Sequence, residues 1–148
     1  MNFIRTELGY FLPVTSELGL RELKWQRGSF PTGLNFPNLN PDVSRETIKE
    51  ISLYLSGTLK KFSIPIDLSC WTNEMVVWFS LLSQIPYGVT ISYEELARRW
   101  GNKKASRAAG QACKRNPIPL IIPCHRIMNK DKNIKHYSGG EFNHSNFK

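Results

Sequence analysis

Apolar and polar positions in the first third of the chain follow the pattern of short strands and one helix. The runs GYFLPV (9–14) and GLRELKW (19–25) are rich in apolar residues and are separated by TSEL, which predicts a β-hairpin. The segment 29–44 is rich in Pro, Asn and Ser and is expected to be a loop. Apolar residues then recur near helical spacing, which predicts a helix over 45–62. These residues are Ile48, Ile51, Leu55, Leu59 and Phe62.

The pattern changes after this helix. SIPIDLSC (63–70) is expected to be a linker, since a proline interrupts two extended segments. EMVVWFSLLSQI (74–85) is apolar on nearly all sides and predicts a helix buried between other elements, ending at Pro86-Tyr87-Gly88. We therefore expect two subdomains, at residues 1–66 and 67–148.

Two short helices joined by a tight turn are predicted beyond residue 91. Ser92 and Glu95 form a capping box at the start of the first helix. The first helix is expected to end at Gly101-Asn102, and the second is expected to end before Asn116-Pro117. The apolar face of the first helix consists of Tyr93, Leu96, Ala97 and Trp100, and that of the second of Ala105, Ala108, Ala109, Ala112 and Cys113. This pair is typical of a helix-turn-helix.

Charge is distributed unevenly along the chain. The net charge is +8, but residues 1–86 hold 8 basic and 8 acidic side chains, whereas residues 87–148 hold 12 and 4. Within 98–115 seven side chains are basic and none is acidic. A solvated basic face is the simplest interpretation of such a run. Its coincidence with the predicted helix-turn-helix favours DNA as the partner.

Composition excludes several classes of protein. With 41% hydrophobic residues in 148, the chain can build a core. Three cysteines without C-x-x-C spacing argue against a disulfide framework and a cysteine-rich zinc knuckle. Neither a signal-peptide pattern nor a stretch long enough to span a membrane is present in the sequence. We expect a cytoplasmic protein, or a nuclear one in a eukaryote, with reduced thiols and no membrane partner.

The candidate chemistry centres on Cys124. A cysteine is a nucleophile as its thiolate, which needs a neighbouring base or cation, and His125 and Arg126 follow it directly. The alternative is that Cys124 is a small buried apolar residue and His125 a structural histidine. The preceding run NPIPLII (116–122) is interrupted by proline and cannot be a regular central strand, so we expect a rigid loop that presents Cys124 in a pocket.

Several motifs together resemble a known family. IPYG, SYEELA, ASRAAGQA, NPIPLIIPCHRI and YSGG occur in the order and spacing of the alkylguanine-DNA alkyltransferases, over about residues 45 to 140. The resemblance implies an α+β fold, with a ribonuclease-H-like N-terminal subdomain and a mostly helical, winged-helix-like subdomain that contains the helix-turn-helix. It implies direct-reversal DNA repair, in which each molecule irreversibly takes one alkyl group from oxygen 6 of guanine.

The resemblance also implies roles for individual residues. Cys124 is the alkyl acceptor, His125 removes its proton through a water, and Tyr93 donates a proton toward the leaving guanine. Asn116 holds the turn between the second helix and the active-site loop. The base pocket consists of Pro119 and Tyr137 as apolar walls and Ser138 as a hydrogen-bond partner of oxygen 6.

Further implications concern DNA. The target base must leave the stack, and Arg107 is expected to fill the gap while the alanine-rich helix lies in the minor groove. The expected DNA-binding residues are Arg107, Ala108, Gly110, Gln111 and Lys114. The implied partner is double-stranded DNA with an alkylated guanine, bound by a monomer. No cofactor or metal is expected, since residues 1–69 contain neither Cys nor His, the zinc ligands of some relatives.

One feature departs from the family pattern. Relatives continue beyond the Gly-Gly turn into a helix with a glutamate that orients the histidine, whereas this sequence reads EFNHSNFK. Glu141 is a candidate substitute, and without a partner for His125 we expect a slow acceptor. Three alternatives remain: an alkyltransferase-like protein that binds damage without reacting, a helix-turn-helix transcription regulator with a structural Cys-His pair, and a Cys-His hydrolase.

Overall fold

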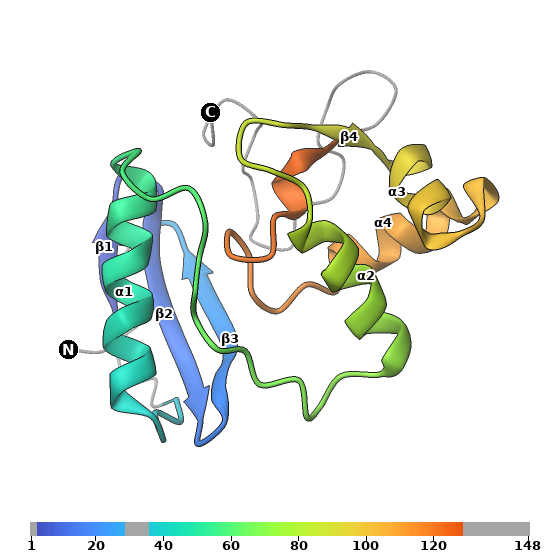
Figure 1. Ribbon diagram of the computed structural model, residues 1–148. Helices are drawn as coiled ribbons and strands as arrows, with labels where there is room; N and C mark the ends of the chain where they lie inside the picture. The colour runs from blue at the N-terminus through green and yellow to red at the C-terminus, as the bar shows by residue number, and fades with distance from the viewer. Residues whose placement is uncertain (1–2, 29–35, 129–148) are drawn as a thin grey trace. The chain divides into compact units, whose positions relative to one another are not determined.

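The computed structural model describes residues 3–28 and 36–128 (Figure 1). Its contacts divide the chain into two compact units, Met1–Cys70 and Trp71–Lys148. The boundary expected after residue 66 lies in the same linker, four residues before the end of the first unit. Helices and small sheets occur together, so the α+β class is confirmed. Over the described residues, no helix combines the length and the apolar character that crossing a membrane requires.

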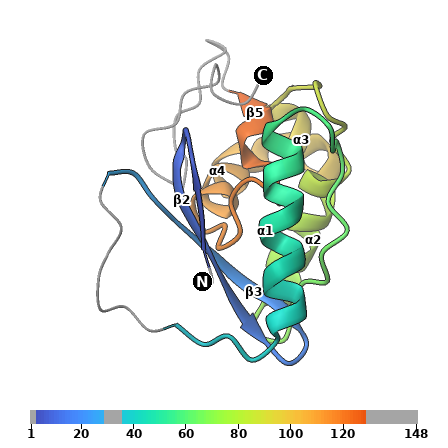
Figure 2. The same ribbon diagram turned by 90° about the vertical axis from the view of Figure 1, so that its left-hand side faces the viewer.

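The first unit is a three-stranded antiparallel sheet with one helix. Strands β1 (Ile4–Thr6), β2 (Gly9–Ser16) and β3 (Gly19–Gln26) lie in sequence order, and β2 and β3 form the predicted hairpin. Strand β1 was not predicted, because three residues are too few to show a period. Helix α1 (Pro41–Leu55) lies on one face of the sheet (Figures 1 and 2) and contacts all three strands. The buried residues of this unit include Phe11, Leu20, Leu23 and Ile51.

Helix α1 begins and ends earlier than the predicted range of 45–62, so both predicted boundaries were wrong. Its start is set by Asn40, whose side chain accepts a hydrogen bond from the N–H of Val43, and by Pro41 in the first turn. Its end is a Schellman motif. Gly57 has φ 82, its N–H bonds to the Tyr54 carbonyl, and the N–H of Thr58 bonds to the Leu53 carbonyl.

The linker 63–70 is tied to the hairpin. The N–H of Leu20 donates to the Pro65 carbonyl and the N–H of Asp67 donates to the Leu20 carbonyl, both at 2.8 Å. The buried Asp67 carboxylate accepts hydrogen bonds from the Ser16 hydroxyl at 2.6 Å and from the N–H of Ser69 at 2.9 Å. These hydrogen bonds lower the pKa of Asp67 to about 2, so the linker is held by an ionised carboxylate at neutral pH.

The second unit contains the predicted helix-turn-helix and a two-stranded parallel ladder. Helices α3 (Tyr93–Trp100) and α4 (Ser106–Lys114) pack against each other, and α2 (Asn73–Ser83) contacts both. Strand β4 pairs with β5, Ile91 opposite Ile127 and Ser92 opposite Met128, which joins the start of α3 to the residues after Cys124. The elements are α2 (Asn73–Ser83), β4 (Ile91–Ser92), α3 (Tyr93–Trp100), the 3-10 helix η1 (Lys103–Ala105), α4 (Ser106–Lys114), the 3-10 helix η2 (Cys124–Arg126) and β5 (Ile127–Met128).

Helix α2 was predicted to be buried between other elements; it contacts α3 and α4, but part of its surface is exposed. Trp78, Phe79 and Leu82 are buried, whereas Val77 is 46% exposed. The Trp78 ring stacks on Trp100 of α3 with 4.2 Å between the ring centroids. In a run of mostly apolar residues, hydropathy is similar at most positions. It therefore cannot indicate which of them contact a neighbouring helix.

Candidate active site

Helix α3 places Tyr93 at its first position. The Ser92 hydroxyl accepts a hydrogen bond from the N–H of Glu95 at 3.0 Å, which is one half of the predicted capping box. The Glu95 carboxylate pairs with Arg98 and Arg99 of the same helix. Gly101, with φ 117, ends the helix as predicted. The side chain of Tyr93 is therefore fixed at the point where β4 becomes α3.

Asn116 organises the turn that leads from α4 to Cys124. Its side-chain oxygen accepts a hydrogen bond from the N–H of Ile118 at 2.9 Å. Its side-chain nitrogen donates to the Ile122 carbonyl at 2.9 Å and to the Cys124 sulfur at 3.1 Å. The side chain is buried, so these hydrogen bonds form away from water. Asn116 thus fixes both the loop and the position of the thiol, as expected for a residue that holds this turn.

Two tight turns complete the loop and keep it irregular, as expected from its prolines. The N–H of Ile121 bonds to the Pro119 carbonyl at 2.9 Å around Leu120, which has φ 73 and is buried. The N–H of Cys124 bonds at 2.8 Å to the carbonyl two residues earlier, around Pro123 with φ −83 and ψ 63, an inverse γ-turn. A positive φ at a non-glycine residue costs about 1–3 kcal/mol. The packing of Leu120 and its neighbours therefore holds the loop, in which Pro119 is also buried.

Cys124 is the first residue of η2 and is 2% exposed. Burial is the main reason that the pKa of its thiol lies well above the usual value. A hydrogen bond with the Cys113 thiol and the charge of Cys113 raise the pKa further, whereas the hydrogen bond from Asn116 lowers it. Cys124 is therefore a neutral thiol at rest and needs a base before it can act as a nucleophile.

Tyr93 lies close to both of these thiols. Burial raises the pKa of its phenol well above the usual range, and the charges of Cys113 and Cys124 raise it further. A Cβ added to Gly110 of α4 would lie 3.9 Å from the Tyr93 ring, so α4 presents a small residue to that ring. The phenol consequently keeps its proton at neutral pH and can serve as a hydrogen-bond donor.

His125 and Arg126 complete η2. His125 is 3% exposed. The guanidinium of Arg126 donates a hydrogen bond to the Ile85 carbonyl at 2.6 Å and lies 5.9 Å from the centroid of the Tyr87 ring. The residue after Cys124 is thus buried, and the next one ties η2 to the segment that follows α2.

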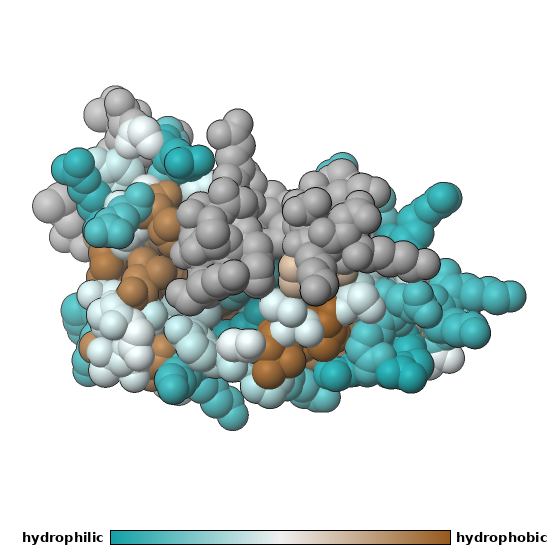
Figure 3. Space-filling model, turned by 90° about the horizontal axis from the view of Figure 1, so that it is seen from above, coloured by the Kyte–Doolittle hydropathy of each residue, from teal (hydrophilic) through white to brown (hydrophobic). Residues whose placement is uncertain are grey.

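The outer side of the helix-turn-helix is basic. Figure 3 shows hydrophilic side chains projecting from the region of α3 and α4, on the right of the view. Of the residues expected to bind DNA, Arg107, Gln111 and Lys114 are exposed, whereas Ala108 and Gly110 are partly buried. The seven basic residues of 98–115 are all exposed: Arg98, Arg99, Lys103, Lys104, Arg107, Lys114 and Arg115.

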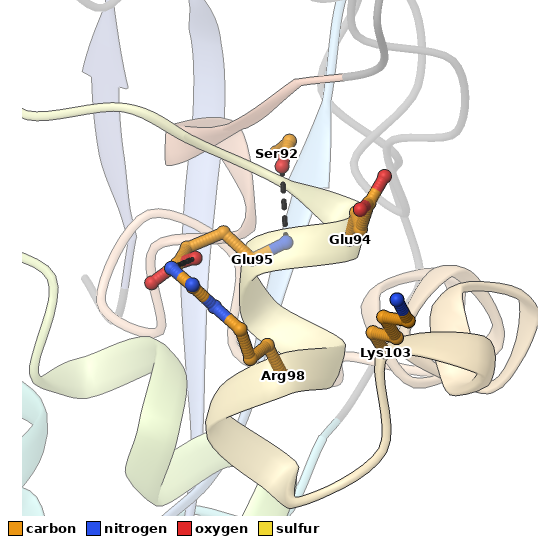
Figure 4. A pocket seen from close by; sticks show the side chains of 5 residues that line it. All are labelled: Ser92, Glu94, Glu95, Arg98 and Lys103. Carbon is orange, nitrogen blue, oxygen red and sulfur yellow. Dashed lines mark hydrogen bonds and ion pairs between the residues drawn. The ribbon is translucent and has the colours of Figure 1, made fainter.

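A polar pocket of about 450 Å³ lies at the start of α3 (Figure 4). Ser92, Glu94, Glu95, Arg98 and Lys103 line it, with Arg98 lying across the Glu95 carboxylate. Its side chains carry both signs of charge and include no cysteine. We therefore place the candidate site at the buried thiol and not at this surface pocket.

The structure brings the four predicted catalytic residues into one region. Cys124 contacts Asn116, lies near Tyr93 and precedes His125 in η2. Tyr137, Ser138 and Glu141 lie outside the described residues. Sequence reasoning placed Cys113 on an apolar helix face and did not connect it with Cys124. Helix α4 ends at Lys114, two residues before Asn116, so the sequence signal for the end of this helix also placed Cys113 near the start of the loop that carries Cys124. Within 3–28 and 36–128, no group of three or more His, Cys, Asp or Glu residues could hold a metal.

Comparison with known proteins matches the chain to methylated-DNA–protein-cysteine methyltransferases. A family model described as the DNA-binding domain of 6-O-methylguanine DNA methyltransferase matches residues 74–146. A methylated-DNA–protein-cysteine methyltransferase of Methanosarcina acetivorans is 34% identical over 136 residues, which cover 90% of this chain and 85% of that protein. One from Mus musculus is 51% identical over 68 residues, 46% of this chain and 32% of that protein.

Solved structures show the same similarity over most of the chain. An O6-methylguanine methyltransferase of Mycobacterium tuberculosis superimposes with a TM-score of 0.78 at 29% identity, covering 93% of this chain and 83% of that one. The Mycobacterium tuberculosis protein in complex with DNA gives a TM-score of 0.79 at 28% identity, covering 93% and 84%. The similarity extends over both compact units.

Proposed function

The chain belongs to the methylated-DNA–protein-cysteine methyltransferase family of DNA repair proteins, and from this premise we propose that it transfers an alkyl group from oxygen 6 of guanine in duplex DNA to Cys124. The observation that carries the proposal is the position of the Cys124 thiol. It is buried and held by Asn116, and it lies near Tyr93, the first residue of a helix-turn-helix with an exposed basic side.

The proposed reaction is an in-line displacement. His125, through a water, takes the thiol proton, and the Cys124 sulfur attacks the alkyl carbon. The bond between this carbon and guanine oxygen 6 breaks, and its electron pair stays on the base. The elevated pKa of Cys124 supports a role for a base, because the resting thiol must lose its proton before the attack. The product is a thioether on the protein.

Tyr93 assists the departure of the base in this proposal. Negative charge builds on guanine as the carbon–oxygen bond breaks, and a proton donated by the Tyr93 phenol reduces it. The phenol is protonated at neutral pH and lies near Cys124, so it has a proton to donate, while burial makes it a weaker acid than an exposed tyrosine. The phenolate then recovers a proton from water, so Tyr93 is unchanged at the end.

The target base must reach a thiol that is buried in the protein. We propose that the nucleotide rotates out of the duplex and that Arg107 occupies the gap, with Pro119, Tyr137 and Ser138 holding the base. The exposure of Arg107 on α4 supports this role. Ala108 and Gly110 have small side chains, which suits the approach of a helix to a narrow groove.

Each molecule acts once in this proposal, since a thioether has no ready leaving group with which to restore the thiol. Every group that the mechanism uses comes from one chain, so the acting species is a monomer. Titration of the protein with excess alkylated duplex gives a stoichiometry of one, and the complex sediments with one protein per lesion. Repeated turnover or a dimer on one lesion contradicts these two parts of the proposal.

The test is transfer from a duplex that carries one O6-methylguanine. Intact-protein mass is expected to rise by one methyl group, located by peptide mapping on Cys124. Cys124→Ala is expected to bind the duplex without gaining mass, and Cys70→Ser serves as the control that retains transfer. A label on Cys70 or Cys113 refutes the assignment of the acceptor. Binding without any gain in mass supports the damage-binding or regulator alternatives.

A further inference from the structure

The loop that carries Cys124 contains one residue in a strained backbone conformation. Leu120 has φ 73, and within the described part of the chain it is the only residue other than glycine with a positive φ. The N–H of Ile121 donates to the Pro119 carbonyl at 2.9 Å, which closes a γ-turn around Leu120. A γ-turn with a positive φ is rare and strained, whereas the inverse form around Pro123 is common.

A leucine stays in this conformation only where its surroundings hold it there. A positive φ brings the Cβ of an L residue close to the neighbouring peptide groups, so glycine is the residue that usually occupies this region. Leu120 is buried, as are Ile118 and Ile122 on either side of the turn. Strain of this kind is found mostly at functional sites. The turn is therefore a candidate for a role beyond packing.

The hydrogen bonds around Leu120 connect the turn with Asn116. The N–H of Ile122 donates to the Ile118 carbonyl at 3.0 Å, and the N–H of Ile118 donates to the Asn116 side-chain oxygen at 2.9 Å. The Ile122 carbonyl in turn accepts a hydrogen bond from the Asn116 side-chain nitrogen at 2.9 Å. A change of φ at Leu120 rotates every later residue of the loop about one bond. Such a change would therefore move Ile122 away from these partners.

We propose that Leu120 is a positioning residue for the acceptor, because its strained turn sets the place of the Ile122 carbonyl and, through it, of the Cys124 sulfur. The Ile122 carbonyl also accepts the N–H of Cys124 at 2.8 Å. The Asn116 nitrogen that bonds to this carbonyl also donates to the Cys124 sulfur at 3.1 Å. A displaced Ile122 thus displaces both the backbone of Cys124 and the amide that holds its sulfur.

The consequence for the reaction rests on the proposed function. An in-line displacement requires the attacking sulfur, the alkyl carbon and the leaving oxygen to be aligned. A misplacement of about 1 Å can reduce the rate of such a step about a hundredfold. The side chain of Leu120 supports stability by packing, whereas its positive φ supports the rate by fixing the sulfur. These two contributions can be separated by substitution.

The test compares Leu120→Gly with Leu120→Ala in the full chain. Both variants lose the buried leucine side chain, but only glycine adopts φ 73 without strain. Leu120→Gly is therefore expected to melt about 2–4 °C above Leu120→Ala. It is also expected to accept the benzyl group of free O6-benzylguanine about tenfold faster per folded molecule, with the folded fraction taken from circular dichroism. A glycine variant that is both less stable and slower than the alanine variant overturns the proposal.

Ile118→Gly and Ile118→Ala are the matched controls. Ile118 is buried in the same loop, and its φ is not positive. Glycine there relieves no strain and adds freedom to the unfolded chain, so Ile118→Gly is expected to be less stable and slower than Ile118→Ala. The order of the glycine and alanine variants should thus invert between the two positions. The same order at positions 118 and 120 contradicts a special role for the turn.

Hydrogen exchange supplies a readout that needs no alkyl transfer. In the parent protein, the N–H groups of Ile121, Ile122 and Cys124 are expected to exchange slowly, and in Leu120→Ala faster than in Leu120→Gly. Fast exchange in the folded parent overturns the proposal even if neither variant folds. A parent with slow exchange that never gains alkyl mass refutes the proposed function and leaves the ordering of the loop by the turn standing. Equal transfer rates per folded molecule in the two Leu120 variants refute only the positioning role.

Discussion

Cys124 is the proposed nucleophile, and a nucleophilic cysteine must ionise. Its thiol is nevertheless buried, and burial raises its pKa and favours the neutral form. A solvent-exposed cysteine ionises more readily but would be held less firmly. Here Asn116 and the γ-turn around Pro123 fix the position of the sulfur, and the same burial keeps the thiol protonated. We therefore expect the rate of transfer to depend on the removal of the thiol proton.

The rate of methyl transfer is expected to rise with pH. Below the elevated pKa of Cys124 the thiolate fraction grows about tenfold for each pH unit, and the attacking species grows with it. Single-turnover transfer from free O6-benzylguanine between pH 6 and 9 measures this dependence without a contribution from DNA binding. Circular dichroism over the same range controls for unfolding. A rate that is constant across the range would show that the thiolate already exists at neutral pH.

Arg107→Ala is expected to slow the repair of duplex DNA much more than the reaction with free O6-benzylguanine. Only the duplex requires a gap in the stack to be filled, and unstacking costs a few kcal/mol. Lys104→Ala is the matched control, because it also removes one exposed positive charge from the helix-turn-helix region. Equal losses on both substrates, or equal effects of the two variants on duplex repair, contradict the proposed role of Arg107.

At the scale of elements, the features predicted correctly are those that neighbouring residues in the sequence determine. The hairpin, the stop at Gly101 and the helix-turn-helix follow from period and turn residues, and all three are confirmed. Strands β4 and β5 were not predicted, because each has two residues and their pairing joins positions 36 residues apart. The link from Cys113 through Asn116 to the Cys124 sulfur was missed as well, because it depends on how the loop folds back after α4.

Arg126 is expected to position η2. Removing a hydrogen bond to a charged group costs about 1.5–3 kcal/mol, so Arg126→Ala should lower the free energy of unfolding by about this amount. The variant should also slow transfer from free O6-benzylguanine, because η2 carries Cys124. Arg126→Lys is the conservative variant, and it should restore stability in part. If Arg126→Ala loses stability but keeps the pH–rate profile of the parent, the residue is structural only.

Gly57→Ala is expected to destabilise the first unit by about 1 kcal/mol, because φ is +82 there and an L side chain is strained in that region. No atom lies within 4 Å of the added Cβ, so strain alone sets the cost. Gly57→Asn should cost less, since asparagine tolerates a positive φ. Thermal unfolding of the two variants checks this order. A larger loss for asparagine than for alanine contradicts the Schellman assignment.

At the scale of the whole molecule, charge and chemistry belong to the same compact unit. Residues 1–86 carry no net charge, and the unit Trp71–Lys148 holds both the basic helix-turn-helix and Cys124. This placement could be inferred from the sequence, because net charge and motif order are visible there. The geometry of the base pocket could not, since it depends on packing among distant residues and on positions beyond Met128.

DNA affinity is expected to fall as salt rises, with a log–log slope of about −0.9 for each phosphate contacted. Lys114→Ala should reduce the magnitude of this slope by about one such unit if Lys114 contacts a phosphate. Lys49→Ala, on the exposed side of α1, is the matched control and should leave the slope unchanged. An affinity that does not respond to salt contradicts the basic surface as the DNA-binding site.

The burial of Cys124 also has a consequence for the chemical lifetime of the protein. A protein that reacts only once, as proposed, loses a whole molecule to every encounter between its thiol and an unrelated electrophile. Inside the fold, Cys124 is shielded by Asn116 and the Pro119–Pro123 loop and is mostly uncharged, whereas Cys70 is exposed to the same reagents. The small thiolate fraction that is expected to slow repair is therefore also expected to keep unused molecules intact until they meet the lesion.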